Sequence, residues 1–326
     1  MKKKFMCMLL TGVMAASMLA GCGSSDNAAD NTTNEGAADN TANNAAANGT
    51  AADTATDNAA ESSNFDTDEF IAVYSREDGS GTRGAFIELF GIEEKDENGE
   101  KIDYTTEEAV ITNSTDVMLT SVSGDTYGIG YVSLGSLNDT VKAVKIDGAE
   151  PTVENIKSGA YTIARPFNIA TKADVSEATQ DFINFVMSAE GQAVITENGY
   201  IGSDDAAAYE SNGATGKVVV GGSSSVSPVM EKLIEAYKAV NAEAQIELQT
   251  SDSTTGMTGA ADGTLDIGMA SRELKDTEVE AGLTGTKIAM DGIAVVVNLE
   301  NPADDLSTET VKGIFTGEIT EWNGIQ

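Results

Sequence analysis

"SREDGSGTRGAF", residues Ser75–Phe86, follows a strand-like run, "FIAVY" (70–74), and leads into a helix-like run, "GAFIELF" (84–90). Arginines, glycines and hydroxyl side chains fill the space between the two runs. The first N–H groups of a helix are unpaired and carry partial positive charge, so they bind anions. The guanidinium group of an arginine can donate two parallel hydrogen bonds to a tetrahedral oxyanion. The stretch therefore predicts a small-anion site where a strand turns into a helix.

Two further strand-to-helix junctions have similar chemistry, "GGSSSVSP" (Gly221–Pro228) and "SDSTTGM" (Ser251–Met257). Glycine lets the backbone approach a ligand closely, and hydroxyl groups donate hydrogen bonds without adding net charge. A single serine-rich junction is more often a plain helix cap than a binding site. Three such junctions, one of them flanked by arginines, favour a shared anion site.

Strand and helix patterns alternate along the chain, which predicts an α/β fold with mostly parallel strands. The clearest helical pattern is "SEATQDFINFVMSAEGQAVITENG" (176–199). The polar, small-residue stretch "GSDDAAAYESNGATG" (202–216) is typical of a linker. "GSGTRG" also fits the G-x-G-x-x-G dinucleotide pattern, but no second strand follows the helix promptly, so we discount nucleotide binding.

The beginning of the chain has the pattern of an export signal. Three lysines precede an apolar run that ends in "LAGC" (19–22), which predicts a signal peptide over 1–21. "LAGC" resembles the bacterial lipobox, in which the cysteine is lipidated, so Cys22 is the expected anchor; the alternative is an ordinary signal with an incidental cysteine. Residues 22–64 contain no lysine, arginine or large apolar side chain and predict a disordered tether.

Composition narrows the function classes. The formal net charge of −34 repels nucleic acid and anionic lipid. A buried anion site is still possible, because local dipoles and hydrogen bonds dominate there. Histidine is absent, which excludes Ser-His and Cys-His catalysis and the usual zinc sites. The cysteines are Cys7 and Cys22, and Cys7 leaves with the signal, so no disulfide, cofactor or metal is predicted.

The chain resembles the substrate-binding lipoproteins of bacterial phosphate ABC transporters over nearly all of 70–326. The resemblance rests on "SREDGSGTRGAF", "GGSSSVSP", "TSDSTTGM", "LDIGMASREL", "IFTGEITEWNG", "GIGYVSL", "YTIARPF" and "FINFVMSAEGQAVITENGYI". It implies a type II periplasmic-binding-protein fold, which has two α/β lobes around a hinged anion cleft.

The resemblance also implies the contacts with the anion. On one lobe they are Ser225, the backbone N–H of Val226, and Ser253. From the other lobe come Arg76, Ser80, Gly81 and Thr82. Where some members have an aspartate that accepts the proton of hydrogen phosphate, this chain has Ser271, followed by Arg272. This departure weakens the case for phosphate over another oxyanion, and Arg272 could equally form an ion pair.

The order of the motifs is rotated relative to the family. The GSGT loop comes first here, and "IFTGEITEWNGIQ", which normally precedes it, ends the chain. We therefore expect a circular permutation in which 202–216 joins the usual ends, with one lobe over 65–165, the other over 166–326, and one crossover near Tyr161–Phe167. The ends of the ordered chain should lie close together. The rival interpretation is a fragment of a tandem protein.

The expected function is high-affinity binding of inorganic phosphate outside the membrane and its delivery to an ABC permease. The chain would be a monomer, held at the extracytoplasmic face of the cell membrane by its lipid anchor alone, and would not bind nucleic acid. The alternatives are a binding protein for sulfate or molybdate, or a sensor or adhesion module on the same fold. An enzyme acting on phosphate esters is less well supported, because no nucleophile with a base is found.

Overall fold

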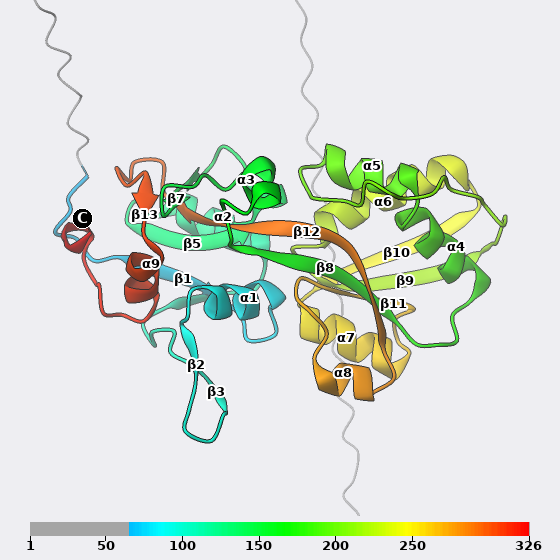
Figure 1. Cartoon of the computed structure of the whole chain (residues 1–326), viewed down its shortest axis with the longest axis horizontal. Coiled ribbons are helices and arrows are strands. Elements are labelled where there is room, and N and C mark those ends of the chain that lie inside the picture. The colour runs from blue at the N-terminus through cyan, green and yellow to red at the C-terminus, as the bar shows by residue number, and fades with distance from the viewer. Residues whose placement is uncertain (1–64, 326) are drawn as a thin grey trace, which may run out of the picture. The chain divides into compact units, whose positions relative to one another are not determined.

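The computed structural model describes residues 65–325 (Figure 1). The predicted signal peptide, the anchor at Cys22 and the tether lie outside the described residues. Among the described residues, no helix combines the length and the apolar character needed to cross a bilayer.

One large sheet runs through the described part of the chain, in the order β10-β9-β11-β8-β12-β5-β1-β4, with β6 beside β12. Its strands are β1 Ala72–Arg76, β4 Val110–Thr112, β5 Gly128–Ser133, β6 Lys142–Ala143, β8 Ala164–Thr171, β9 Gly216–Ser223, β10 Ala244–Ser251, β11 Ile267–Ala270 and β12 Thr284–Val297. Two small sheets pair β2 Glu93–Lys95 with β3 Lys101–Asp103, and β7 Lys145–Ile146 with β13 Asp305–Leu306.

The helices cover both faces of the large sheet (Figure 1). They are α1 Gly81–Leu89, α2 Thr115–Gly124, α3 Val153–Ser158, α4 Glu177–Val186, α5 Ala189–Glu197, α6 Ser227–Val240, α7 Ser253–Asp262, α8 Asp276–Glu280 and α9 Thr308–Phe315, with short 3-10 turns at η1 Leu134–Ser136 and η2 Trp322–Gly324. Several helices begin at a serine whose side chain accepts a hydrogen bond from the backbone three residues on, as Ser80, Ser114 and Ser176 do. The predicted helix over 176–199 is split into α4 and α5, because Ser188 caps a new helix.

Pairing is parallel at both ends of the large sheet and antiparallel in its middle. β1 pairs in parallel with β4 and β5, and β9 with β10 and β11. β8 and β12 are antiparallel to each other and to their other neighbours. The α/β fold is thus confirmed, and the parallel arrangement holds on either side of the β8–β12 pair.

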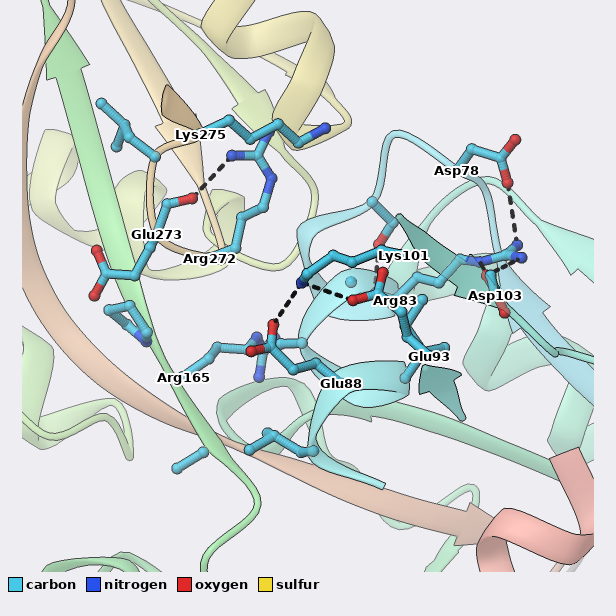
Figure 2. Close-up of a pocket in the computed structure, with 18 of the residues that line it drawn as sticks. Asp78, Arg83, Glu88, Glu93, Lys101, Asp103, Arg165, Arg272, Glu273 and Lys275 are labelled. Carbon is cyan, nitrogen blue, oxygen red and sulfur yellow. Dashed lines mark hydrogen bonds and ion pairs between the residues drawn. The ribbon is translucent and has the colours of Figure 1, made fainter. Parts of the chain in front are cut away.

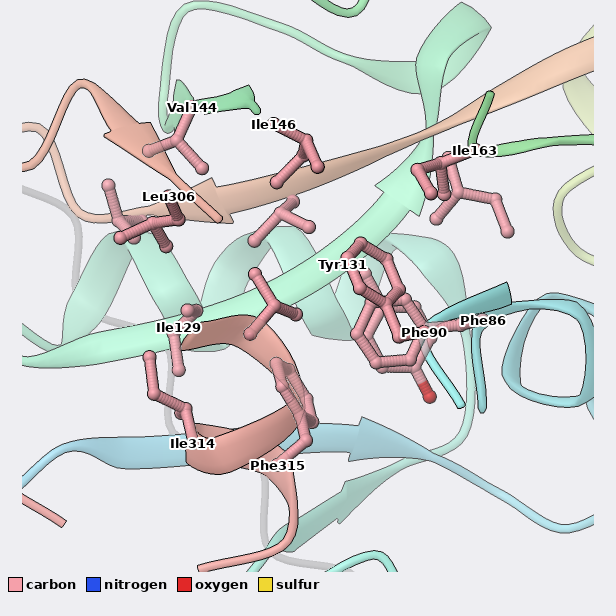
Figure 3. Close-up of a cluster of buried hydrophobic side chains, with 14 of the residues drawn as sticks. Phe86, Phe90, Ile129, Tyr131, Val144, Ile146, Ile163, Leu306, Ile314 and Phe315 are labelled. Carbon is pink, nitrogen blue, oxygen red and sulfur yellow. The ribbon is translucent and has the colours of Figure 1, made fainter. Parts of the chain in front are cut away.

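The two largest hydrophobic cores divide the described residues into lobes, and each lobe also has a smaller cluster of buried hydrophobic residues. In the first core Phe86 stacks on Tyr131 with ring centroids 3.8 Å apart, and Phe315 packs edge-on against Phe86 (Figure 3). The second core gathers Phe182 and Tyr237, among others, between α4, α6 and the sheet. We call the parts of the chain around these cores the first lobe (65–163 and 293–325) and the second lobe (167–289).

The chain crosses between the lobes twice, not once as expected from the sequence. Ile163 belongs to the first core and Phe167 to the second, so the first crossing lies at the start of β8. Ala289 belongs to the second core and Ile293 to the first, so β12 crosses back. The expected lobe over 166–326 is therefore wrong in its second part, because the apolar end of β12 carries 293–325 into the first core. We call these two crossing segments the hinge pair.

The two ends of the described chain lie side by side, as expected. The backbone N–H of Ile71 donates to the Thr320 carbonyl oxygen at 2.8 Å, and that of Asn323 donates to Thr67 at 2.7 Å. Phe65 packs edge-on against Trp322. Both ends lie in the first lobe, whereas we had expected one end in each lobe.

The predicted linker, 202–216, is anchored on α4. The Tyr209 hydroxyl donates to Asp181 at 2.7 Å, and the backbone N–H of Asn212 donates to the same carboxylate at 3.0 Å. Asp181 also accepts from the Tyr237 hydroxyl. Burial acts to raise the pKa of Asp181, but these hydrogen bonds from backbone and side chains outweigh it, so the pKa is lowered.

Candidate functional site

The three junctions singled out in the sequence meet between the lobes. The ends of β1, β9 and β10 lead into α1, α6 and α7, so each helix presents its N-terminal end there. Thr82, in the first turn of α1, lies 2.7 Å from Ser225, which precedes α6. The backbone N–H and the hydroxyl of Thr254, in the first turn of α7, both donate to the Gly79 carbonyl at 3.2 Å.

Buried hydroxyl side chains gather at this meeting point. We call Thr82, Ser223, Ser225, Ser253 and Ser271 the hydroxyl cluster; each is at most 3% exposed. Ser271 lies at its centre, with its hydroxyl 3.0 Å from that of Ser223, 3.3 Å from that of Thr82 and 3.5 Å from that of Ser253. The structure thus brings together Thr82, Ser225, Ser253 and Ser271 from the sequence-based set and adds Ser223.

Gly81 and Ser80 lie against the hydroxyl cluster on the first-lobe side. A Cβ atom added at Gly81 would lie 2.5 Å from the Ser253 hydroxyl oxygen and 2.8 Å from that of Ser271. Only glycine allows the first turn of α1 to approach the other lobe this closely. Ser80 caps α1 by accepting a hydrogen bond from the backbone N–H of Arg83. The backbone N–H of Val226, expected to face the anion, donates to the Ser223 carbonyl at 3.0 Å.

Arg76 lies at the edge of the hydroxyl cluster and is paired with a carboxylate. Its guanidinium donates two hydrogen bonds to Glu77, each 2.8 Å long. It also donates to the Ser224 hydroxyl across the lobes at 3.1 Å, and the Thr115 hydroxyl lies 3.4 Å from Ser224 and from Ser225. The sequence-based set missed Ser224, which adjoins Ser225, and Thr115, the first residue of α2.

Arg272 lies beside the first turn of α7, where its guanidinium donates to the Thr254 hydroxyl at 3.4 Å, and it is paired with a carboxylate. Its guanidinium donates two hydrogen bonds to Glu278 on α8, at 2.7 and 2.9 Å, and one to the Glu273 carbonyl. The ion-pair alternative therefore describes this side chain as the structure has it. A role for Arg272 in binding the anion stays a prediction.

Arg165, which the sequence-based set missed, borders the hydroxyl cluster. Its guanidinium donates to the Thr82 hydroxyl at 3.0 Å and forms a 2.8 Å ion pair with Asp291. Both side chains are almost fully buried, at 2% and 0% exposure. Burial raises the pKa of Asp291, which the guanidinium opposes, and burial lowers the pKa of Arg165, which the carboxylate opposes. The signal available in the sequence was an arginine within the otherwise apolar "YTIARPF".

A cleft of about 970 Å³ adjoins this site between α1 and the segment before α8 (Figure 2). Ser80 and Arg165 contribute to its wall. The rest of the wall combines apolar residues, such as Ile87, Leu89 and Leu274, with charged side chains of both signs, including Asp78, Arg83, Glu88, Glu93, Lys101, Asp103, Glu273 and Lys275. The residues that line this cleft include no member of the hydroxyl cluster, which is buried.

The sequence matches the family model of the PBP superfamily domain over residues 63–190 and 207–324. It is also 60% identical over 256 residues to phosphate-binding protein PstS 2 of Streptococcus agalactiae, covering 78% of this chain and 87% of that protein. The chain belongs to the PstS family of the PBP superfamily. The resemblance noted in the sequence is therefore confirmed.

Another PstS relative has a solved structure. It is a phosphate ABC transporter, phosphate-binding protein from Streptococcus pneumoniae, 46% identical in sequence, with a TM-score of 0.63. The match covers 79% of this chain and 100% of that one. A more distant PstS from Bacillus subtilis is 30% identical over 140 residues, which is 42% of this chain and 46% of that protein. The two-lobe fold is thus shared with proteins of this family.

Proposed function

We propose that this chain binds inorganic phosphate between its lobes and delivers it to an ABC permease at the extracytoplasmic face of the membrane. The names of the PstS relatives support the ligand and the transporter. The proposed binding groups are Ser80, Gly81, Thr82, Ser225, Val226, Ser253 and Ser271, with Arg76 at the edge and Arg272 as a further candidate. Anchoring through lipidated Cys22, action as a monomer and the absence of catalysis are parts of the same proposal.

The hydroxyl cluster is the observation that carries this proposal. Its members come from both lobes and are buried, and Thr82, Ser225 and Ser253 lie at the N-terminal ends of helices. An anion entering there would replace contacts among hydroxyl groups. Each nearby arginine has its own carboxylate: Arg76 pairs with Glu77, Arg165 with Asp291, and Arg272 with Glu278. The anion would therefore be held mainly by neutral dipoles, which suits a buried site in a strongly acidic protein.

Calorimetric titration of the mature chain with phosphate, arsenate, sulfate and molybdate at neutral pH tests the proposal. We expect phosphate and arsenate to bind, because a hydroxyl or backbone oxygen can accept the proton of the hydrogen phosphate ion. Sulfate has no such proton, and one buried unmatched hydrogen-bonding group should weaken its binding by roughly 100-fold. Equal binding of sulfate would favour a general oxyanion carrier, and absence of binding by all four anions would overturn the anion site.

A further inference from the structure

One side chain, Arg165, contacts both lobes and both strands of the hinge pair. It extends from β8 and donates to the Thr82 hydroxyl of the first lobe at 3.0 Å. It also donates to the Ser271 carbonyl of the second lobe at 3.2 Å and to the Gly292 carbonyl of β12 at 3.1 Å. Asp291, its ion-pair partner, is its cross-strand neighbour on β12.

From these contacts we propose that Arg165, held in place by Asp291, is a positioning residue of the anion site; this inference rests on the proposed phosphate binding. A guanidinium has only donors, so Thr82 must accept from it. The remaining neighbours of the Thr82 oxygen are the Ser225 and Ser271 hydroxyls. The Thr82 proton therefore points into the hydroxyl cluster, where it can be donated to an anion.

Asp291 makes the position of Arg165 specific. Burying an arginine without an ionic partner would destabilise the fold. An arginine that is held both by a carboxylate and by hydrogen-bond acceptors keeps a single orientation. Asp291 is itself held by the backbone N–H of Gly135, which donates to its other oxygen at 3.3 Å. The same guanidinium contacts Thr82 and the Ser271 carbonyl across the cleft, so its hydrogen bonds are complete only when the lobes are closed. The Arg165–Asp291 pair thereby couples the orientation of the Thr82 hydroxyl, which would donate to the anion, to closure of the lobes.

A double-mutant cycle between Arg165→Lys and Thr82→Val tests this role through the dissociation constant for inorganic phosphate. Lysine keeps the charge but cannot span Thr82, Ser271 and Gly292 at once. We expect Arg165→Lys to weaken phosphate binding by roughly 10-fold, because one charge-assisted hydrogen bond is lost. In the Thr82→Val background, Arg165→Lys should weaken phosphate binding by less than about 2-fold, because the hydroxyl group that Arg165 orients is absent.

A second variant separates positioning from stability. Arg165→Met/Asp291→Leu removes both buried charges together, and such replacements often preserve or raise stability. We expect the melting temperature of this variant to match or exceed that of the unaltered chain, while phosphate binding stays weakened by about 10-fold or more. Tyr161→Phe is the control, because it deletes a buried hydrogen bond to the Ile293 carbonyl in the same hinge region without contacting the hydroxyl cluster. It should lower the melting temperature and leave phosphate affinity within about 2-fold.

The outcomes distinguish this inference from the proposed function. If the unaltered chain does not bind phosphate, the proposed function fails and this inference fails with it. Suppose instead that the unaltered chain binds phosphate, while Arg165→Lys leaves the affinity unchanged or weakens it by the same factor with and without the Thr82 hydroxyl. Either result would overturn only the positioning role. Recovery of both stability and affinity in Arg165→Met/Asp291→Leu would also overturn it.

Discussion

At the scale of single residues, the pairing of Arg76 with Glu77 determines what a mutation there would do. Arg76→Ala removes a donor that contacts Ser224 and leaves the Glu77 carboxylate unpaired beside an anion site. Ser225→Ala removes one neutral hydroxyl. We expect phosphate affinity to fall by roughly 100-fold or more for Arg76→Ala and by about 10-fold for Ser225→Ala, measured by calorimetry.

The variant Arg76→Ala/Glu77→Gln is the matched control for that comparison. It removes the carboxylate as well, so part of the lost affinity should return if repulsion by Glu77 contributes to the loss. Equal small losses for Arg76→Ala and Ser225→Ala would mean that Arg76 takes no part in holding the anion. In that case its contact with Ser224 would serve only to close the lobes.

At the scale of elements, the first turns of α1 contain two glycines, Gly81 and Gly84, that differ in the space around them. An added Cβ at Gly81 would collide with Ser253 and Ser271 of the second lobe, whereas at Gly84 it would meet nothing within 4 Å. We expect Gly81→Ala to abolish measurable phosphate binding because it props the lobes apart and fills the site. Gly84→Ala should keep the affinity and stabilise the chain by up to about 1 kcal/mol, because alanine favours a helix. Tight phosphate binding by Gly81→Ala would show that the anion lies elsewhere.

The sequence predicts well those parts of the site that are encoded locally. The junctions before α1, α6 and α7 each combine a strand pattern, small polar residues and a helix pattern within a dozen residues, and all three meet at the hydroxyl cluster. Arg165 could not be assigned in this way, because its partners Thr82, Ser271 and Gly292 are 83, 106 and 127 residues away. Which side chains a strand residue meets depends on the sheet order, and local patterns do not specify that order.

The second crossing was missed for a related reason. The apolar run "GIAVVVN" (292–298) has the pattern of a strand, but β12 begins at Thr284 and runs through both lobes. Its first part, "TGTKIAMD", mixes polar and apolar residues because it pairs with β8 near the surface as well as in the core. A strand that is shared by two cores has no single repeat of apolar and polar residues along its whole length, so its full extent is not recognised from the sequence.

At the scale of the whole molecule, the two crossings limit how the lobes can move. β8 and β12 are hydrogen-bonded to each other from Ala164–Gly292 to Thr171–Thr284, so the hinge is a paired ribbon. Closure across the cleft rests on contacts such as those of Thr254 with Gly79 and of Thr82 with Ser225. The looser hinge that a single crossing would give is therefore not expected. An anion between the lobes would replace hydroxyl contacts such as that of Thr82 with Ser225 and would favour the closed form through its own contacts with both lobes.

The rotated motif order leads to a further test on the whole molecule. We propose that the chain is a circular permutation, since its described ends pair through Ile71 with Thr320 and Thr67 with Asn323. A chain that joins Ile325 to Phe65 by a short glycine-serine linker and opens between Asp204 and Asp205 should then fold and bind phosphate within about 3-fold of the natural order. Both aspartates are exposed, and the opening leaves the contacts of Tyr209 with Asp181 in place.

A control that joins the same ends but opens between Asp291 and Gly292 should fail to fold, because it cuts β12 where it crosses the hinge and separates Arg165 from both of its β12 partners. Circular dichroism and thermal melting would compare the two openings at equal concentration. Native-like melting of the first and loss of structure in the second would mean that 202–216 acts as a joint between old ends while the hinge pair is indispensable. Failure of the first opening would instead favour the fragment interpretation, in which 202–216 is an original part of the fold.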